Sequence, residues 1–345
     1  MFLHNAWYIA AWASEVERQL VHRTLLGEPV VLYRKRDGSA VALEDACPHR
    51  KLPLSMGILK DDLIQCGYHG LEFDCSGRCV NIPGQEKISP DARVKSYPVV
   101  ERWNLLWVWM GEAGSENTDD IIEIPHYTDS HWGINRGPAM SIDCDYRYMT
   151  DNLVDPSHVS YVHKSSLGNE DSIGIPVKTR EEDNSVIVSR WILNAELAPF
   201  FQPYMKFSGK ADRLQHYEVR LPSSAVIKDV IAPAGSGAPE GKIHPDSFLL
   251  DSYNFVTPVS ADSCRYYWFQ VRNFDAQDKA VSSSLTEAFM TAFNEDVQVL
   301  EAVHSGIKNS RSELIHLQID SGSARLRRLL NKMLSQEQPI GDRQS

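Results

Sequence analysis

The sequence has no long hydrophobic run. Its 345 residues contain no stretch of roughly 18 or more apolar residues, the length that a transmembrane helix needs. Residues 1–13 have no basic segment followed by an extended apolar one, so they do not resemble a secretory signal peptide. We therefore expect no membrane association and a cytoplasmic location.

Positive charge is also scarce. The chain has 35 lysines and arginines against 46 aspartates and glutamates, which gives a net charge of −11 and a pI of about 5.6. This balance argues against nucleic acid or an anionic membrane as a partner. One local basic run, at residues 325–328, is interpreted as the solvated face of a helix.

Six cysteines are too few and too scattered for the disulfide framework of a secreted protein. Cys47 and Cys66 belong to the motif described next. The other four are expected to be free thiols in a reducing compartment: Cys75, Cys79, Cys144 and Cys264.

Two short Cys–His motifs stand near the N-terminus. Cys47 and His49 form C-x-H, and after sixteen further residues Cys66 and His69 form C-x-x-H. Two thiolates and two imidazoles in this arrangement can hold a [2Fe–2S] cluster of the Rieske kind, in which two histidines replace two cysteines on one iron. Such a cluster suits the delivery of single electrons to a metal that activates oxygen.

A tetrahedral zinc site is the alternative use of these four residues. Zinc sites usually group like ligands, as C-x2-4-C followed by H-x3-5-H. Here each loop contains one cysteine and one histidine, which favours the cluster. Turn-forming residues around both motifs, including Gly67 and Gly70, would let backbone N–H groups point at the sulfurs. Tyr68, beside His69, is a candidate hydroxyl donor to the cluster.

A second constellation contains His158 and His163. Five residues apart, they would lie about 140° apart around a regular helix, so both can reach one metal only if the helix bends or ends between them. Two histidines and one carboxylate form the facial triad of non-haem Fe(II) sites. Asp296 is the best carboxylate, because it lies on the apolar stripe of the helix expected over residues 284–304. Glu295 and Glu301 are competitors that we expect to face solvent.

The pair of histidines is weak evidence when taken alone, since two ordinary packed or exposed histidines give the same pattern. Asp155 can similarly be a helix N-cap with Pro156 at the first helical position. The upstream cluster motif strengthens the metal interpretation, because an electron-carrying cluster needs an electron acceptor.

The predicted fold class is α+β with two domains. An all-β Rieske domain is expected over residues 1–115 and a catalytic domain, with an antiparallel sheet flanked by helices, over residues 116–345. The acidic segment 111–125 is the expected linker. The catalytic domain should end with the helix over 284–304 and an amphipathic helix over 324–337.

Seven segments together resemble the Rieske non-haem iron oxygenases, over nearly the whole chain. Within that family the likeness is greatest to the subgroup of vanillate O-demethylase oxygenase subunits, toluenesulfonate methyl-monooxygenase and dicamba O-demethylase. The segments are NAWY at 5–8, CPHR at 47–50, CGYHGLEF at 66–73, IPGQ at 82–85, DNLVD at 151–155, YVH at 161–163 and RNF at 272–274.

The resemblance implies a role for each matching position. Cys47, His49, Cys66 and His69 would bind the cluster, and His158, His163 and Asp296 would bind the mononuclear Fe(II), with Asn152 close to it. Asp155 would be the carboxylate that connects the cluster of one subunit with the iron of the next, and that orients His158. The family also implies a head-to-tail homotrimer.

One departure from the family is Pro156, which lacks a backbone N–H and puts the geometry of the Asp155 connection in question. Asn254 and Phe293 are candidate pocket positions, with ordinary packing as the alternative. Arg190, Arg213 and Arg220 are candidates for binding a carboxylate or sulfonate, but a surface role is the simpler expectation for each.

The expected function is that of a terminal oxygenase that hydroxylates a methyl carbon of a small aromatic acid with O₂, with O-demethylation of a methoxybenzoate such as vanillate as the first choice. The alternatives are aryl-methyl or ring hydroxylation and a non-catalytic Rieske electron-transfer protein. The sequence has no glycine fingerprint for nicotinamide. Electrons are therefore expected from a separate NAD(P)H-dependent reductase with flavin and ferredoxin centres.

Overall fold

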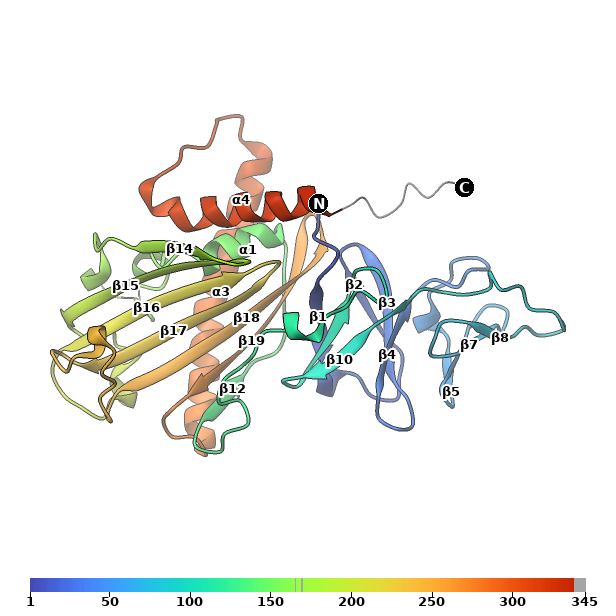
Figure 1. Cartoon of the computed structure of the whole chain (residues 1–345), viewed down its shortest axis with the longest axis horizontal. Coiled ribbons are helices and arrows are strands. Elements are labelled where there is room, and N and C mark those ends of the chain that lie inside the picture. The colour runs from blue at the N-terminus through green and yellow to red at the C-terminus, as the bar shows by residue number, and fades with distance from the viewer. Residues whose placement is uncertain (165, 169, 338–345) are drawn as a thin grey trace. The chain divides into compact units, whose positions relative to one another are not determined.

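The computed structural model describes residues 1–164, 166–168 and 170–337 (Figure 1). It divides into two compact units. Unit 1 consists of Met1–Glu123 together with Thr257–Ser260, and unit 2 of Ile124–Val256 together with the described residues from Ala261 onward. The chain passes from one unit to the other between Glu123 and Ile124, within the segment expected as a linker. Two residues of that segment, Ile121 and Ile122, are buried, so the segment is not exposed to solvent along its whole length.

Unit 1 is built from three antiparallel sheets, with strand orders β1-β11-β10, β2-β3-β4-β9 and β5-β6-β7-β8. Its strands are short and are joined by tight turns such as the one at Gly38, whose φ of 87° suits glycine. The strands are β1 (Trp7–Trp12), β2 (Val21–Leu25), β3 (Glu28–Arg34), β4 (Ala40–Glu44), β5 (Ile58–Lys60), β6 (Leu63–Gln65), β7 (Glu72–Phe73), β8 (Cys79–Asn81), β9 (Ser96–Tyr97), β10 (Val99–Arg102) and β11 (Leu105–Trp109).

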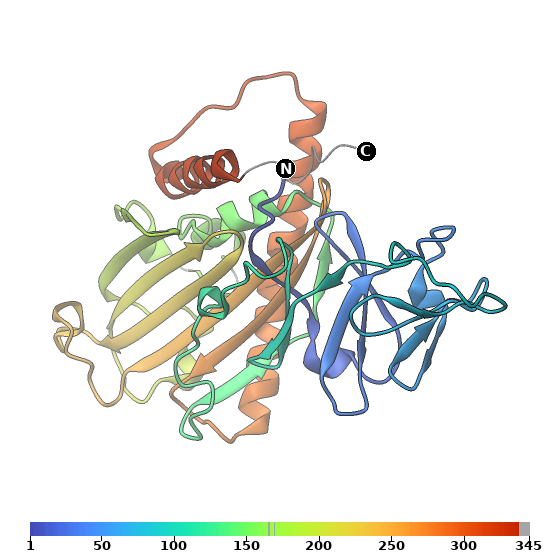
Figure 2. The same ribbon diagram turned by 45° about the vertical axis from the view of Figure 1, so that its right-hand side comes forward.

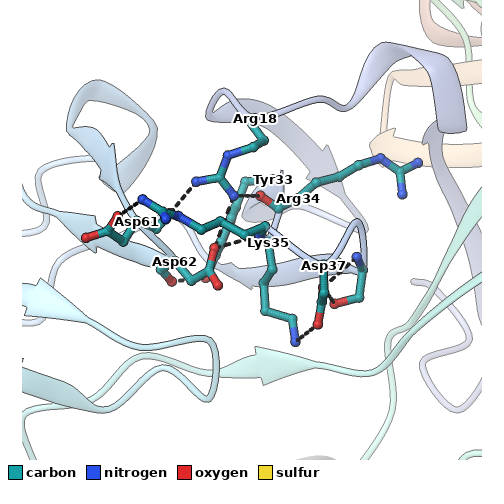
Figure 3. A network of polar contacts seen from close by, with 9 residues as sticks. Arg18, Tyr33, Arg34, Lys35, Asp37, Asp61 and Asp62 are labelled. Atoms are coloured by element: carbon teal, nitrogen blue, oxygen red, sulfur yellow. Dashed lines mark hydrogen bonds and ion pairs between the residues drawn. The ribbon is translucent and has the colours of Figure 1, made fainter.

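A network of polar contacts links the β5–β6 hairpin to the strand β3 (Figure 3). The Arg18 guanidinium donates to the Asp62 carboxylate (3.1 Å), to the Asp61 carbonyl (2.6 Å) and to the Arg34 carbonyl (3.2 Å). The Tyr33 hydroxyl donates to the Asp62 carbonyl at 3.3 Å. These contacts fix the hairpin that leads into the second Cys–His loop.

Unit 2 contains one large antiparallel sheet of 8 strands, in the order β12-β19-β18-β17-β16-β15-β14, with β13 also paired to β19. The four long central strands pair with their sequence neighbours, as expected for a meander of hairpins. The strands are β12 (Gly133–Arg136), β13 (Met140–Ile142), β14 (Lys178–Glu182), β15 (Ser185–Ala195), β16 (Ala211–Arg220), β17 (Ser224–Pro233), β18 (Phe248–Ser260) and β19 (Ser263–Arg272).

In the part of unit 2 that the structure describes, four α-helices accompany this sheet. The long helix α3 runs across one face of it (Figure 2), and α1 contacts β16 and β17 while α4 contacts β14 and β15. Asp278 caps α3 by accepting hydrogen bonds from the N–H groups of Ala280 and Val281. The helices are α1 (Tyr146–Leu153), α2 (Val159–Val162), α3 (Lys279–Asn309) and α4 (Ser321–Gln336).

The predicted fold class is confirmed: β-rich unit 1 is followed by an antiparallel sheet with helices. The helices predicted over 284–304 and 324–337 are present as α3 and α4, and α3 is longer than predicted at both ends. Among the described residues, no helix is both long enough and apolar enough to span a bilayer.

Candidate metal centres

The two Cys–His loops share one backbone conformation. In the first loop the Cys47 N–H donates to the Leu52 carbonyl and the Lys51 N–H to the Cys47 carbonyl. In the second, the N–H groups of Cys66 and Gly70 donate to the carbonyls of Leu71 and Cys66. Lys51 and Gly70 hold the same place in their loops, and both have positive φ, 59° and 74°. The two motifs therefore present their side chains from matching turns.

The two thiols lie together in the interior. Cys47 and Cys66 are each 2% exposed. Burial raises the pKa of the Cys47 thiol to about 11, hydrogen bonds from the backbone N–H groups of His49 and Arg50 act in the opposite direction, and the neighbouring Cys66 thiol adds to the rise. Backbone N–H groups that reach a sulfur are the donors that stabilise a metal-bound thiolate.

The two imidazoles lie together at the surface. His49 and His69 are exposed, and their ring centroids are 4.5 Å apart. The Tyr68 ring packs beside His69, with centroids 3.9 Å apart. A buried pair of thiols and an adjacent exposed pair of imidazoles match the division of a Rieske cluster, in which one iron takes sulfur and the other takes nitrogen ligands. The donor set therefore fits a [2Fe–2S] cluster.

A buried aspartate anchors the first loop. Asp45, which is 2% exposed, accepts hydrogen bonds from the Ser55 backbone N–H (2.7 Å) and hydroxyl (2.6 Å). It also lies 2.6 Å from His22 Nδ1. The loop containing Cys47 is thus fastened at both ends by one carboxylate.

The second centre brings together His158, His163 and Asp296, as predicted. One ligand atom from each lies within 4.8 Å of the others. Asp296 Oδ1 is 3.6 Å from His158 Nε2 and 3.2 Å from His163 Nε2. This arrangement fits a facial triad, because two imidazole nitrogens and one carboxylate oxygen converge from one side.

One short helix separates the two histidines, and each of them stands at one of its ends. Helix α1 ends at Leu153, and the short α2 has His158 as its N-cap and His163 as its C-cap. The expected end of the helix between the two histidines is found at Val162, because His163 has already left the helical conformation, with a φ of −101° and a ψ of 31°. The suggestion that Asp155 is an N-cap is wrong, because α2 begins four residues later, at Val159, with His158 as its N-cap.

Two neighbours support the triad. Asn152 Nδ2 donates to Asp296 Oδ1 at 3.1 Å, and Glu295 Oε2 lies 2.8 Å from His163 Nδ1. Burial lowers the pKa of His163, but the hydrogen bonds to Asp296 and Glu295 outweigh it, so the net shift is upward. The expectation that Glu295 faces solvent is wrong. Glu301 lies elsewhere and accepts from the Asp143 N–H at 3.0 Å.

Asp155 lies at the edge of this centre. Its Oδ1 accepts a hydrogen bond from the Ser157 N–H at 2.7 Å. Its Oδ2 is 4.0 Å from His158 Nδ1, which is longer than a hydrogen bond. The side chain is 30% exposed, so the carboxylate is accessible from outside the unit.

Two buried arginines were not expected in the interior. Arg190 and Arg213 are 7% and 8% exposed, so the surface role is wrong for both, whereas Arg220 is partly exposed. The sequence does not show which face of these strands is covered by helices. The structure places β15 against α4 and β16 against α1.

A cavity adjoins the triad, and the three triad residues and Asn152 line part of it. The lining also contains apolar groups and one charged pair. These residues are Ile227, Leu250, Phe289, Phe293, Arg213 and Asp229. Phe293 thus lies at the pocket, as suggested from the sequence. Asn254 is fully buried and accepts a hydrogen bond from the Tyr266 hydroxyl at 2.6 Å.

Comparisons with known proteins agree with this geometry. Residues 6–98 match the Rieske [2Fe–2S] domain, and residues 142–336 match the vanillate O-demethylase oxygenase C-terminal domain. The chain is 38% identical over 343 residues to the iron–sulfur subunit of a toluene-4-sulfonate monooxygenase system from Comamonas testosteroni, covering 98% of each chain. It is 35% identical over 350 residues to a vanillate O-demethylase oxygenase subunit from Pseudomonas sp. strain HR199, covering 99% of this chain and 98% of the relative.

Solved structures extend the likeness to the fold. Dicamba monooxygenase bound to 3,6-dichlorosalicylic acid superposes with a TM-score of 0.89 at 29% identity, covering 98% of this chain and 99% of that one. The first domain match contains the Cys–His loops, the second contains the triad, and both relatives cover nearly the whole chain. The chain therefore belongs to the family of Rieske-type monooxygenase oxygenase components whose second domain is of the vanillate O-demethylase kind.

Proposed function

We propose that this chain catalyses oxidation of a methyl carbon on a small aromatic acid, with O-demethylation of a methoxybenzoate such as vanillate as its reaction. The observation that carries the proposal is the convergence of His158, His163 and Asp296 within 4.8 Å beside a cavity lined partly by Phe289 and Phe293. A chain that only carried electrons would need neither this triad nor a cavity next to it.

The proposed ligands of the cluster are Cys47, His49, Cys66 and His69, and those of the mononuclear iron are His158, His163 and Asp296. A dicamba monooxygenase of the same fold, 27% identical to this chain, is described with non-haem iron and dicamba, which supports iron at the triad. When bound, the cluster supplies single electrons and the ferrous ion supplies a site at which O₂ is reductively activated. We further propose that residues 1–115 form the cluster domain and residues 116–345 the catalytic domain.

The chain's own residues orient the ligands and the substrate. Glu295 accepts a hydrogen bond from His163 Nδ1 and so leaves Nε2 free to bind a metal. Asn152 fixes the Asp296 carboxylate through Oδ1. Apolar side chains on α3 and the sheet keep water from the reacting methyl group and hold an aromatic ring. Hydroxylation of a methoxy carbon gives a hemiacetal, which collapses to a phenol and formaldehyde.

The proposed partners are a separate NAD(P)H-dependent reductase with flavin and ferredoxin centres, and two further copies of the chain in a homotrimer. The curated relatives are called a subunit of a monooxygenase system and an oxygenase component, which supports a separate source of electrons.

Asp155 would connect the cluster of one protomer with the iron of the next. It lines a hollow of about 740 Å³ together with Tyr161, Ile173 and Ile319, and these exposed apolar side chains suit contact with a second subunit. The four cysteines outside the proposed cluster site form no disulfide, which supports a reducing cytoplasmic location.

A substrate panel with the purified holoenzyme and a surrogate reductase tests the reaction. We expect one formaldehyde for each methoxybenzoate consumed, and about three irons per chain, two in the cluster and one at the triad. A chain with two irons and no turnover would instead be an electron carrier.

Aryl-methyl hydroxylation is the second candidate, because the chain is 38% identical to a toluene-4-sulfonate monooxygenase subunit. A benzylic alcohol formed from toluene-4-sulfonate, with no formaldehyde from any methoxybenzoate, would favour it over O-demethylation.

A further inference from the structure

The cavity beside the triad has one strongly polar wall. Arg213 on β16 and Asp229 on β17 both line it, and their side chains are only 10% and 13% exposed. The lining also includes the apolar residues Ile227, Leu250 and Phe289. A buried ion pair at a cavity is costly unless it is well paired or used by a ligand.

The guanidinium of Arg213 is held rigidly. Its Nε and Nη2 both lie 2.8 Å from Asp229 Oδ1, and Nη1 donates to the Leu167 carbonyl at 3.3 Å. The ring of Phe201 lies 4.4 Å below the guanidinium carbon. Among the described residues, these contacts use three of the five N–H groups that an arginine offers.

A rigid arginine with N–H groups to spare is a receptor for a planar or tetrahedral oxyanion. Guanidinium binds carboxylates and similar anions through parallel hydrogen bonds, and a fixed one loses little entropy on doing so. Asp229 holds Arg213 through one oxygen, Oδ1, and its negative charge balances that of the guanidinium, so a bound anion gains mainly the hydrogen bonds of the remaining N–H groups. The second buried arginine, Arg190, lies on the neighbouring strand β15, close enough to Arg213 for the two positive charges to repel each other, but it does not line this cavity.

We propose that Arg213, positioned by Asp229, binds the carboxylate or sulfonate of the aromatic substrate and so determines specificity for aromatic acids. The assignment rests on the proposed function, because it takes the cavity as the substrate site. The anion at Arg213 and the methyl carbon at the triad then lie at opposite ends of one bound molecule. An aromatic with the same methyl group but a neutral amide in place of the anion would lose the charged contact only.

Equilibrium binding to the reduced, iron-loaded holoenzyme without O₂ tests this assignment. The probes are 4-methoxybenzoate with 4-methoxybenzamide, and toluene-4-sulfonate with toluene-4-sulfonamide, so that each anion has a neutral partner of similar shape. The variants are R213Q, R213K and D229N. R220Q is the matched control, because Arg220 lies on the same strand, is partly exposed and is absent from the cavity lining.

We expect R213Q to raise the Kd of the preferred anion by about 10- to 100-fold, the value of a charge-assisted hydrogen bond, and to change amide binding little. The Kd of R213K for the anion should lie between those of the wild type and R213Q, because lysine keeps the positive charge but lacks the parallel N–H donors of a guanidinium. D229N should tighten anion binding roughly twofold or more, because a like charge near the ligand is removed. The acid whose Kd rises in R213Q, either the carboxylate or the sulfonate, is the anion that Arg213 binds.

Equal losses for anion and amide in R213Q would overturn the assignment and leave the pair a packing element. If R213Q does not fold, the same comparison of anion with amide in R213K decides. Formaldehyde release is measured separately on the same wild-type protein. If no formaldehyde is released but the Kd of the anion depends on Arg213, only the demethylation proposal is contradicted. If formaldehyde is released but the Kd of the anion does not depend on Arg213, only this inference is contradicted.

Discussion

Nη2 of Arg190 donates a hydrogen bond of 3.1 Å to the Pro156 carbonyl, between Asp155 and the metal-site residue His158. The same guanidinium donates to the carbonyls of Ser172 (2.9 Å) and Ile175 (3.2 Å) and to Gln215 Oε1 (2.7 Å). One buried cation therefore fastens the chain before α2, the chain after it and the strand β16. Its interactions need only the carbonyl of Pro156, so the missing N–H of that residue does not disturb them.

Replacement of Arg190 should loosen the triad. Arg190→Met leaves buried acceptors unpaired, at a cost of about 1–3 kcal/mol for each one that finds no water. We expect a lower melting temperature and loss of the mononuclear iron, while the two cluster irons stay. Arg190→Lys should be intermediate, because an ammonium cannot reach four acceptors. Arg180→Gln on β14, which is exposed, is the control. Full iron content in Arg190→Met would contradict this role.

Glu295 should tune the metal affinity through His163. In Glu295→Gln the amide oxygen can still accept from Nδ1, but the negative charge is gone. Partners of this kind are worth about 10- to 100-fold in metal affinity, and we expect a loss in that range for Fe(II), measured by competition with a chelator. Glu301→Gln is the matched control on the same helix. If both variants bind iron equally well, Glu295 has no part in holding the metal.

Proton binding should compete with metal binding at His163. Its pKa is raised above 6.5, since Asp296 and Glu295 outweigh the effect of burial. In the metal-free protein the charged form stabilises the fold below pH 6.5, and this contribution is lost as the pH rises through the raised pKa. The metal needs the neutral ring, so its affinity should fall at low pH.

Two measurements check this pH dependence. The melting temperature of the metal-free protein should decline between pH 6.5 and the raised pKa, and the decline should be smaller in Glu295→Gln. Fe(II) affinity should increase over the same interval. A metal-free protein whose stability rises through this interval would show that burial, rather than the two carboxylates, controls the ring.

Asp155 should act between subunits. We expect Asp155→Asn to keep both metal centres and lose turnover, and Cys66→Ser to lose the cluster and turnover. Co-expressed, the two inactive chains should recover about a quarter of the wild-type activity if they assemble randomly in a ring, because some contacts pair an intact cluster with an intact Asp155. Ser157→Ala is the control for local disturbance. No recovery in mixed, cluster-containing oligomers would exclude transfer between protomers through Asp155.

The parts of the site whose residues lie close together in the sequence can be predicted from it. Cys47 and His49, and Cys66 and His69, are recognisable because each pair lies in one turn. Asp296 was found because a carboxylate on an apolar helical stripe needs a partner. The neighbouring Glu295 was misjudged for the same reason: it lies about 100° around the helix from Asp296, off the apolar stripe but against His163.

The rest depended on tertiary contacts. Arg190 and Arg213 lie on strands whose alternation does not reveal which face is covered. Strand β1 is not predicted from the sequence. All of Trp7–Trp12 is buried, so the strand lacks the alternation of apolar and polar residues that marks a half-exposed strand. The basic run at 325–328 was interpreted as a solvated face, yet Arg327 forms a paired salt bridge with Asp151 at 2.6 Å that fastens α4 to α1.

The matching conformation of the two Cys–His loops bears on how such a centre can be transplanted. Each is a six-residue unit closed by two backbone hydrogen bonds, with a left-handed residue at its fifth position. Gly70 adopts that conformation freely, whereas Lys51 does so against its preference. A designer who grafts both units onto a new β scaffold can therefore reuse one backbone template twice, with glycine at each fifth position, and leave the sulfur–nitrogen asymmetry to the side chains.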